Sequence, residues 1–122
     1  MFTQKKSNGS EVKVLLYDKL IATNSNIERK GDTNPYTSVN GNMFTHLTPE
    51  GVLAIRLPEK ERELFIKKYK TKLNVAYGVV RKEYVEVPDS LLKKTSELKT
   101  YLEISYAYAK TLKPKPTTKK KK

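Results

Sequence analysis

Hydrophobic residues recur along this 122-residue chain with two periods, one typical of helices and one typical of strands. Val12 and Leu16 belong to a series of apolar residues spaced four apart, which predicts an amphipathic helix over residues 11–23. Ser10 has a side chain suited to a helix N-cap. We therefore expect the helix to follow a flexible polar lead at residues 1–10.

Two different turn signals in the next part of the chain predict three strands joined by tight turns. Asn40-Gly41 tolerates positive φ at both positions, as a two-residue hairpin loop requires. Thr48-Pro49-Glu50-Gly51 suits a type I turn. We expect an irregular strand start at residues 27–30, then strands at residues 36–40, 42–48 and 52–57.

Alternating residues indicate which side of a strand faces the core. Leu53, Ile55 and Leu57 share one face, and we expect that face to point inward. Residues 79–87 alternate in the same manner and give the clearest single strand signal in the chain. A connection containing Gly78 leads into this strand.

Proline positions mark the starts of the remaining helices. Pro58 suits the first position of a helix over residues 58–70. Pro88 introduces a helical C-terminal third, in which apolar and small residues keep a helical period. Either one long helix or a short helix followed by a longer one fits this pattern, and Thr95-Ser96 would be the break and the new cap.

Together these elements predict a two-layer α+β domain. Its antiparallel sheet would comprise a three-strand meander plus one or two further strands, packed with helices in the order α-β-β-β-α-β-α(α). The chain length fits one domain with one core, which we assign to residues 11–112. Residues 113–122 contain two prolines and a lysine run, and we expect this tail to be disordered.

The formal net charge of +12 is concentrated at the C-terminal end. Residues 110–122 hold seven lysines and no acid, which leaves +5 for residues 1–109. Lysine outnumbers arginine by 21 to 4, whereas sites that grip phosphates or read bases favour arginine. The excess charge is therefore typical of solubility and loose electrostatic attraction.

Composition limits the chemistry that the chain can support. It has no cysteine and a single histidine, and its five glycines are isolated, so we expect no metal site, no cofactor and no phosphate-binding loop. We interpret His46 as an ordinary exposed or hydrogen-bonded histidine, since catalysis needs an orienting partner. Glu83 and Glu86 should face opposite sides of their strand. We expect no catalytic residues and no enzyme activity.

Membrane and export signals are not expected. The first ten residues lack the apolar core of a signal peptide, and no run approaches the roughly 20 apolar residues of a membrane span. We expect a soluble cytoplasmic protein that does not bind membranes.

Several short phrases, in their order and spacing, resemble the N-terminal domain of the TfoX/Sxy family of bacterial competence regulators. They are VNGNMF at residues 39–44, LAIR at residues 53–56 and RKEYVEVP at residues 81–88. The similarity covers residues 11–112, although RKGDTNPY at residues 29–36 replaces the usual Lys-Met-Phe-Gly-Gly phrase. The resemblance implies the same α+β fold, in a stand-alone copy of the domain.

The same resemblance implies a small non-enzymatic regulatory module that binds a protein, for example one of the transcription apparatus. One exposed sheet face would be the partner surface. The alternative interpretation is that this face is simply the polar, solvent-facing side of an antiparallel sheet. Its candidate residues are Tyr36, Asn42, Arg56, Lys82 and Tyr84. An unrecognised hydrolase is a further hypothesis, which a deep pocket lined by His46, Glu83 or Arg56 would favour. The oligomeric state does not follow from the sequence.

The alternative function is direct, largely nonspecific nucleic-acid binding through the basic C-terminal helix and the lysine tail. Tyr101, Tyr106 and Tyr108 would stack bases in that case, although helical spacing favours packing roles for them. The candidate contacts are Lys99, Lys110, Lys113, Lys115, Lys119, Lys120, Lys121 and Lys122.

This alternative predicts a steep dependence of binding on salt. The logarithm of the association constant with DNA or RNA should fall linearly with the logarithm of salt concentration, because lysines release counterions from phosphates. Binding should largely disappear when residues 110–122 are removed. A fluorescence-anisotropy titration at several salt concentrations measures both effects, and salt-insensitive or absent binding by the intact chain contradicts the alternative.

Overall fold

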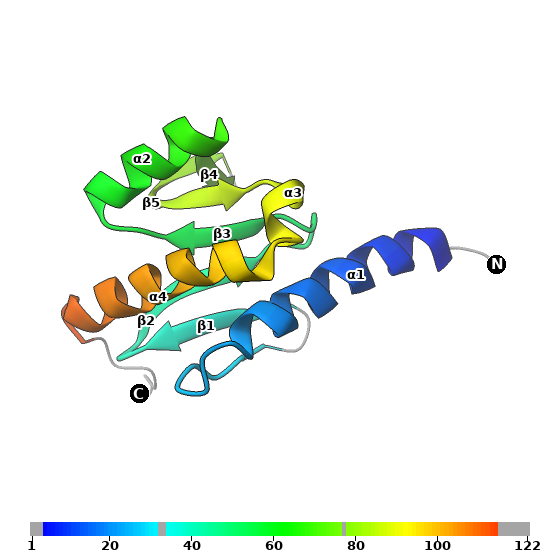
Figure 1. Ribbon diagram of the computed structural model, residues 1–122, viewed down its shortest axis with the longest axis horizontal. Coiled ribbons are helices and arrows are strands. Elements are labelled where there is room, and N and C mark those ends of the chain that lie inside the picture. Colours follow the sequence, from blue (N-terminus) through cyan, green and yellow to red (C-terminus); the bar gives the residue numbers. More distant parts are fainter. Residues whose placement is uncertain (1–3, 32–33, 77, 115–122) are drawn as a thin grey trace.

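The structure is a computed structural model that describes residues 4–31, 34–76 and 78–114, with side chains described from Glu11 onward except at Ala76. The described residues form the helices and strands labelled in Figure 1. The elements are α1 (Gln4–Ile21), β1 (Tyr36–Val39), β2 (Asn42–Leu47), β3 (Leu53–Arg56), α2 (Glu59–Tyr69), β4 (Leu73–Ala76), β5 (Val79–Val87), α3 (Asp89–Leu92) and α4 (Thr95–Thr111).

The strands form one antiparallel sheet in the order β1-β2-β3-β5-β4. This arrangement confirms the α+β class, the meander and the inclusion of two further strands. Asn40 and Gly41 have φ of 54° and 78°, so the β1–β2 loop uses the positive φ values that its sequence allows. At the next turn, the Gly51 amide donates to the Thr48 carbonyl at 2.9 Å.

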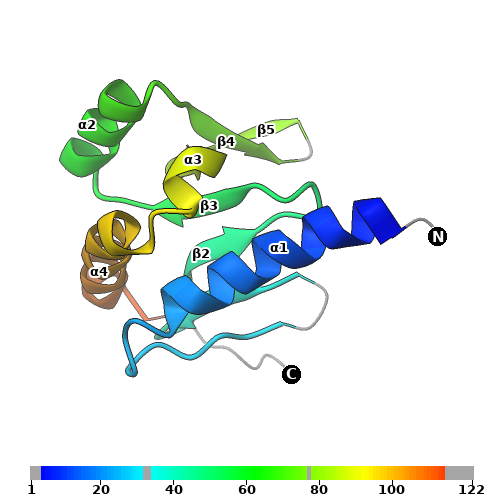
Figure 2. The ribbon, with the colours of Figure 1, turned by 45° about the vertical axis from the view of Figure 1, so that its right-hand side comes forward.

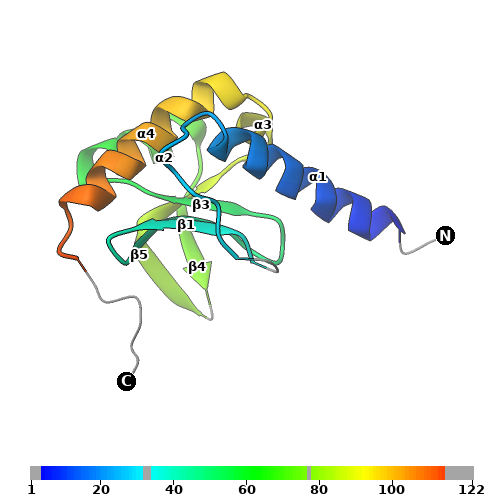
Figure 3. The same cartoon turned by 90° about the horizontal axis from the view of Figure 1, so that it is seen from below.

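All four described helices lie on one side of the sheet (Figure 3). α4 packs across β1, β2 and β3 and contacts α1, whereas α2 packs against β5 (Figure 2). Leu53, Ile55 and Leu57 are fully buried beneath the helices, which confirms the predicted inward face. Each such side chain contributes about 1.5–3 kcal/mol by leaving water. The opposite face of the sheet carries no helix in the part of the chain that the structure describes.

A β-bulge in β2 breaks the alternation of its side chains. Thr37 pairs with Thr45 but Ser38 pairs with Met43, so β2 contains one extra residue, Phe44, opposite β1. Phe44 and Thr45 are consecutive, yet both are fully buried. The Phe44 ring lies 5.6 Å from the ring of Tyr106 in α4, and the Thr45 hydroxyl lies 2.6 Å from that of Tyr17 in α1. Both side chains therefore face the helices.

Aromatic packing joins α2 to α4. The ring of Phe65 lies 4.7 Å from that of Tyr69 and 4.9 Å from that of Tyr101. The Tyr69 hydroxyl donates a hydrogen bond to Glu97 in α4. Burial raises the pKa of Tyr69, and the hydrogen bonds to Glu97 and Tyr101 raise it further. Tyr101 therefore has the packing role that its helical spacing favoured.

The N-terminal region differs from the prediction. α1 begins at Gln4, so Ser10 lies inside the helix and is not its cap. Helix propagation adds a hydrogen bond for each residue ordered, which outweighs the local capping preference of Ser10. Residues 27–30 form no strand either. Only an isolated bridge between Lys30 and Tyr36 joins this segment to β1.

The sequence prediction missed one strand and left the division of the C-terminal third open. Residues 73–76 of the expected connection are β4, which pairs with β5. The C-terminal third is a short helix, α3, followed by a longer one, α4. The break lies at Lys93 and Lys94, just before the predicted Thr95-Ser96. The N-cap is Lys94 without a side-chain cap, so neither Thr95 nor Ser96 acts as the cap. The tail beyond Pro114 lies outside the described residues.

The hairpin of β4 and β5 ends in an exposed apolar group. Val75, Val79 and Val80 are 50%, 62% and 50% exposed. β4 is the last strand of the sheet, so its outer edge has no partner strand among the described residues. Lys70 and Lys72, which precede β4, are exposed as well.

Gly31 and Gly78 provide a matched test of backbone fit. Both have positive φ, 80° and 74°, but an added Cβ at Gly31 would lie 2.4 Å from the Asn34 carbonyl oxygen, whereas one at Gly78 meets nothing within 4 Å. We expect Gly78→Ala to lower the free energy of unfolding by about 1–2 kcal/mol, and Gly31→Ala by roughly 1 kcal/mol more. Urea unfolding measures both, and equal losses would contradict the predicted clash.

Candidate functional site

The candidate site is the helix-free face of the sheet, which we call the open face. Strand register places four side chains in one row across it. Glu86 pairs with Ala54, Ala54 with His46, and His46 with Tyr36. Paired residues of antiparallel strands share a face, and the helices lie on the other side of the sheet. The β2 bulge is what places His46 on the open face while Phe44 points to the helices.

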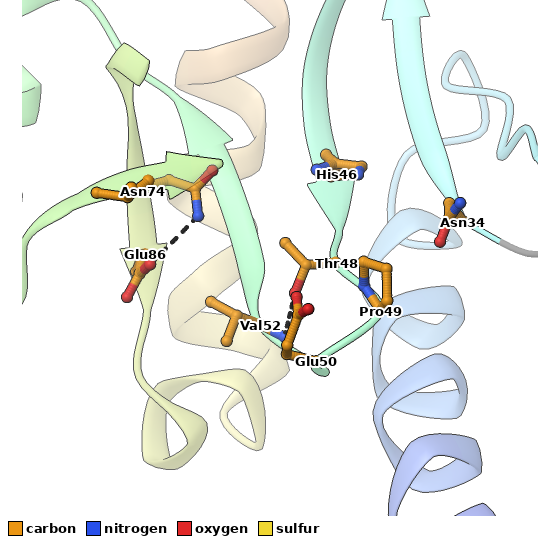
Figure 4. A pocket seen from close by; sticks show the side chains of 9 residues that line it. Asn34, His46, Thr48, Pro49, Glu50, Val52, Asn74 and Glu86 are labelled. Atoms are coloured by element: carbon orange, nitrogen blue, oxygen red, sulfur yellow. Dashed lines mark hydrogen bonds between the residues drawn. The ribbon is translucent and has the colours of Figure 1, made fainter. Parts of the chain in front are cut away.

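A hollow of about 400 Å³ lies between His46 and Glu86 of this row (Figure 4). Side chains from β2, β4, β5 and the β2–β3 turn surround it. Ala54, the smallest member of the row, is fully buried between His46 and Glu86. The lining residues are Asn34, His46, Thr48, Pro49, Glu50, Val52, Asn74, Val75 and Glu86.

Asn74 is the most deeply buried polar side chain of the lining, with 2% of its surface exposed. Its amide nitrogen Nδ2 donates to a carboxylate oxygen of Glu86 at 3.2 Å. Its amide oxygen Oδ1 is buried without a hydrogen-bond partner among the described residues. A buried carbonyl without a partner costs about 1–3 kcal/mol, so this atom favours a hydrogen-bond donor in the hollow.

His46 provides the second unpaired polar atom of the lining, after Oδ1 of Asn74. Its Nδ1 is buried without a hydrogen-bond partner among the described residues. Burial lowers the pKa of His46, the Arg81 charge lowers it further, and Glu50 opposes both. The imidazole is therefore neutral at pH 7, with one nitrogen able to accept a hydrogen bond. The expectation of an ordinary exposed or hydrogen-bonded histidine does not describe this environment.

Beside the hollow, two guanidinium groups flank one tyrosine ring. The guanidinium carbon of Arg81 lies 4.2 Å from the centre of the Tyr84 ring, and that of Arg56 lies 5.6 Å from it. The Tyr84 hydroxyl donates to the Met43 carbonyl at 2.8 Å. Tyr84 is therefore held at both its ring and its hydroxyl group.

Arg56 connects the open face to the helix layer through Glu83. Arg56 Nε lies 2.6 Å from Glu83 Oε1, and the Tyr108 hydroxyl of α4 donates to Glu83 Oε2 at 2.9 Å. Burial alone would raise the pKa of Glu83, but the hydrogen bonds from Arg56 and Tyr108 outweigh it and lower the pKa. Glu83 therefore forms a hydrogen bond with the helix layer, whereas Glu86 lines the hollow. The two side chains face opposite sides of their strand, as their spacing predicted.

The structure brings together three of the five residues predicted for a partner surface. Tyr36, Arg56 and Tyr84 lie on the open face, and Lys82 is exposed two residues before Tyr84. Asn42 lies elsewhere: it is buried and donates to the Lys113 carbonyl at 3.0 Å.

The predicted nucleic-acid contacts are only partly described. Lys99 lies 3.6 Å from Glu103 as an i,i+4 ion pair on α4, and Lys110 lies over the Tyr106 ring. Lys113 contributes its carbonyl to Asn42, so a tail deletion that preserves this contact begins after Pro114. Lys115, Lys119, Lys120, Lys121 and Lys122 lie outside the described residues.

Sequence reasoning missed Asn74 and Arg81 as site residues. They pair across β4 and β5, next to a register irregularity in which Leu73 pairs with Val85 but Asn74 pairs with Arg81. A polar residue in an otherwise apolar four-residue strand was the available signal for Asn74. The irregularity that brings Arg81 to Tyr84 leaves no local sequence pattern.

Comparison with known proteins gives no relative. No family model, curated protein or solved structure matches the chain, so the TfoX resemblance stays a prediction. Among the described residues, three or more His, Cys, Asp or Glu side chains do not gather in a group that could hold a metal ion. No described helix is long and apolar enough to cross a membrane.

The environment of His46 predicts a measurable pH dependence. The single imidazole should titrate in NMR below the ordinary histidine value of 6.5, and Arg81→Gln should move its midpoint upward. Since the unfolded chain takes up this proton at higher pH, the free energy of unfolding should fall as pH drops below about 6.5, until the folded-state pKa is passed.

His46→Gln removes the titrating group and serves as the reference for the stability measurement. The unfolding free energy of the natural chain minus that of this variant should be constant above pH 7 and should decrease toward pH 5. A midpoint at or above 6.5 would contradict the burial of the imidazole.

Proposed function

We propose that this protein is a small binding module that recognises a protein partner through the open face of its sheet. The single observation that carries the proposal is the arrangement at Tyr84, where Arg56 and Arg81 lie close to an aromatic ring on a face that none of the described helices covers. Arginine and tyrosine are enriched at the centres of protein interfaces.

Preorganisation supports this role. The Tyr84 hydroxyl bonds to the Met43 carbonyl, and Arg56 is held by Glu83 at 2.6 Å. Side chains that are already fixed lose less rotamer entropy when a partner binds, which saves about 0.5–1.5 kcal/mol for each. The open face is thus a rigid surface with a few directed groups.

Two considerations favour binding over catalysis. A histidine that acts as a general base needs a group that orients its second nitrogen, and Nδ1 of His46 has no such partner among the described residues. The resemblance of residues 11–112 to the TfoX N-terminal domain implies a regulatory, non-enzymatic role in the bacterial cytoplasm. We extend the proposal to a partner in the transcription apparatus on that resemblance.

The proposal predicts that charge reversal on the open face abolishes partner capture. The natural chain, Arg81→Glu and a control, Lys67→Glu on α2, would each be immobilised and exposed to the same native extract. Proteins enriched by the natural chain and the control should be recovered at least tenfold less with Arg81→Glu, as measured by quantitative mass spectrometry. Circular dichroism checks that both variants are folded.

Recovery of the same proteins with Arg81→Glu would contradict an open-face partner. Equal loss with Lys67→Glu would also contradict it, because it would show general charge attraction. Specific recovery of this chain itself would replace the partner with a second copy.

A further inference from the structure

The hollow is locally acidic in a strongly basic chain. Its lining contains Glu50 and Glu86 but no lysine or arginine, while the whole chain carries +12. Among the described residues, neither carboxylate lies within 4.0 Å of a basic side chain. The nearby guanidinium of Arg81 lies against Tyr84. Local charge therefore favours a cation at the Glu86 end of the hollow.

The orientation of the Asn74 amide adds a directed acceptor. The Glu86 carboxylate only accepts hydrogen bonds, so Nδ2 of Asn74 must face it and Oδ1 must face away. In Figure 4, Oδ1 lies on the side of the amide nearer to His46. Oδ1 is unpaired in a side chain that is 2% exposed. The acceptors at the hollow are thus the partly exposed Glu86 carboxylate and two buried atoms, Oδ1 of Asn74 and Nδ1 of His46, which an occupant reaches only when the surrounding side chains shift.

The walls suit a group with an apolar stem. Pro49, Val52 and Val75 contribute apolar surface to the same hollow. Its volume of about 400 Å³ exceeds what a bare ammonium ion would fill. A planar guanidinium on an aliphatic stem supplies up to five N–H donors in a fixed plane, which matches several separate acceptors better than one ammonium point charge.

We propose that the hollow binds an arginine side chain of the partner protein, with Glu86 and Asn74 as the groups that hold its guanidinium. This inference rests on the proposed function, since the hollow lies on the open face between His46 and Glu86. His46 contributes a further acceptor and Val75 a wall for the stem.

A titration with a minimal probe tests the proposal without the partner. Acetyl-arginine-amide would be added to the isotope-labelled full chain and followed by NMR. Saturable shifts are expected at His46 and at the Asn74 side-chain amide. Acetyl-citrulline-amide has the same shape without the charge and should bind at least tenfold more weakly, because a hydrogen bond between charged groups is stronger than one with a neutral donor. Acetyl-lysine-amide should fall between the two.

Matched variants locate the probe. Glu86→Gln keeps the shape but removes the charge, and it should weaken binding of the arginine probe at least tenfold. Glu103→Gln, an equivalent change on exposed α4, should leave it unchanged. A chain ending at Pro114 should bind the probe as the full chain does. If that truncation instead shifts His46 in the direction opposite to the probe, the chain's own lysine tail occupies the hollow and the proposal is overturned.

Equal binding of citrulline and arginine, or shifts that do not saturate, would also overturn the proposal. The proposed function fails separately. If partner capture depends on Arg81 but the hollow does not bind the probe, the open-face interface stands and the arginine site fails. If the probe binds but partner capture does not depend on Arg81, the open-face interface fails.

Discussion

The hydroxyl of Thr45 fixes the position of α1 on the sheet. It lies 2.6 Å from the hydroxyl of Tyr17 in α1 and 2.6 Å from that of Thr37 in β1. The pKa of Tyr17 is raised to about 12, because the effect of burial outweighs the hydrogen bonds to both threonines, which lower it. A buried hydroxyl without a partner costs about 1–3 kcal/mol, so these three groups strongly favour one position of α1 on the sheet.

The bulge in β2 determines which side chains lie on the open face of the sheet. With regular alternation, Phe44 and His46 would share a face, and burying Phe44 would bury His46 as well. The extra residue opposite β1 lets Phe44 and Thr45 both turn inward and releases His46 to the open face. A packing requirement of the core thus places a polar residue beside the hollow. A small residue of α4 stabilises β2 at the bulge: Ser105 is buried, and its hydroxyl donates a hydrogen bond to the Phe44 carbonyl at 3.2 Å.

Features that depend on local chemistry were predictable from the sequence. Asn40-Gly41 required its turn, residues 79–87 form β5 as predicted, and Leu53 points inward. The start of α1 was not predictable, because the local preference of Ser10 competes with propagation of a helix whose packing lies further along the chain. Strand β4 was missed because four residues give too short a pattern.

The site was less predictable than the fold. Tyr36, Arg56 and Tyr84 were placed on one face by alternation alone, since they lie in strands with clear facing. Asn74 and Glu86 come from different strands, and their contact depends on a register that no local pattern encodes. The expectation for Asn42 followed strict alternation, which the bulge in β2 interrupts.

The outer edge of β4 gives this molecule a risk of self-association. Backbone groups along a free edge can pair with an edge from another molecule, and Val75, Val79 and Val80 would give such a pair an apolar surface. Lys70 and Lys72 stand at the entrance to that strand, so a second copy paired in parallel would bring the same charges close together. Repulsion between these lysines disfavours parallel pairing of two such edges, and this repulsion weakens as salt concentration rises.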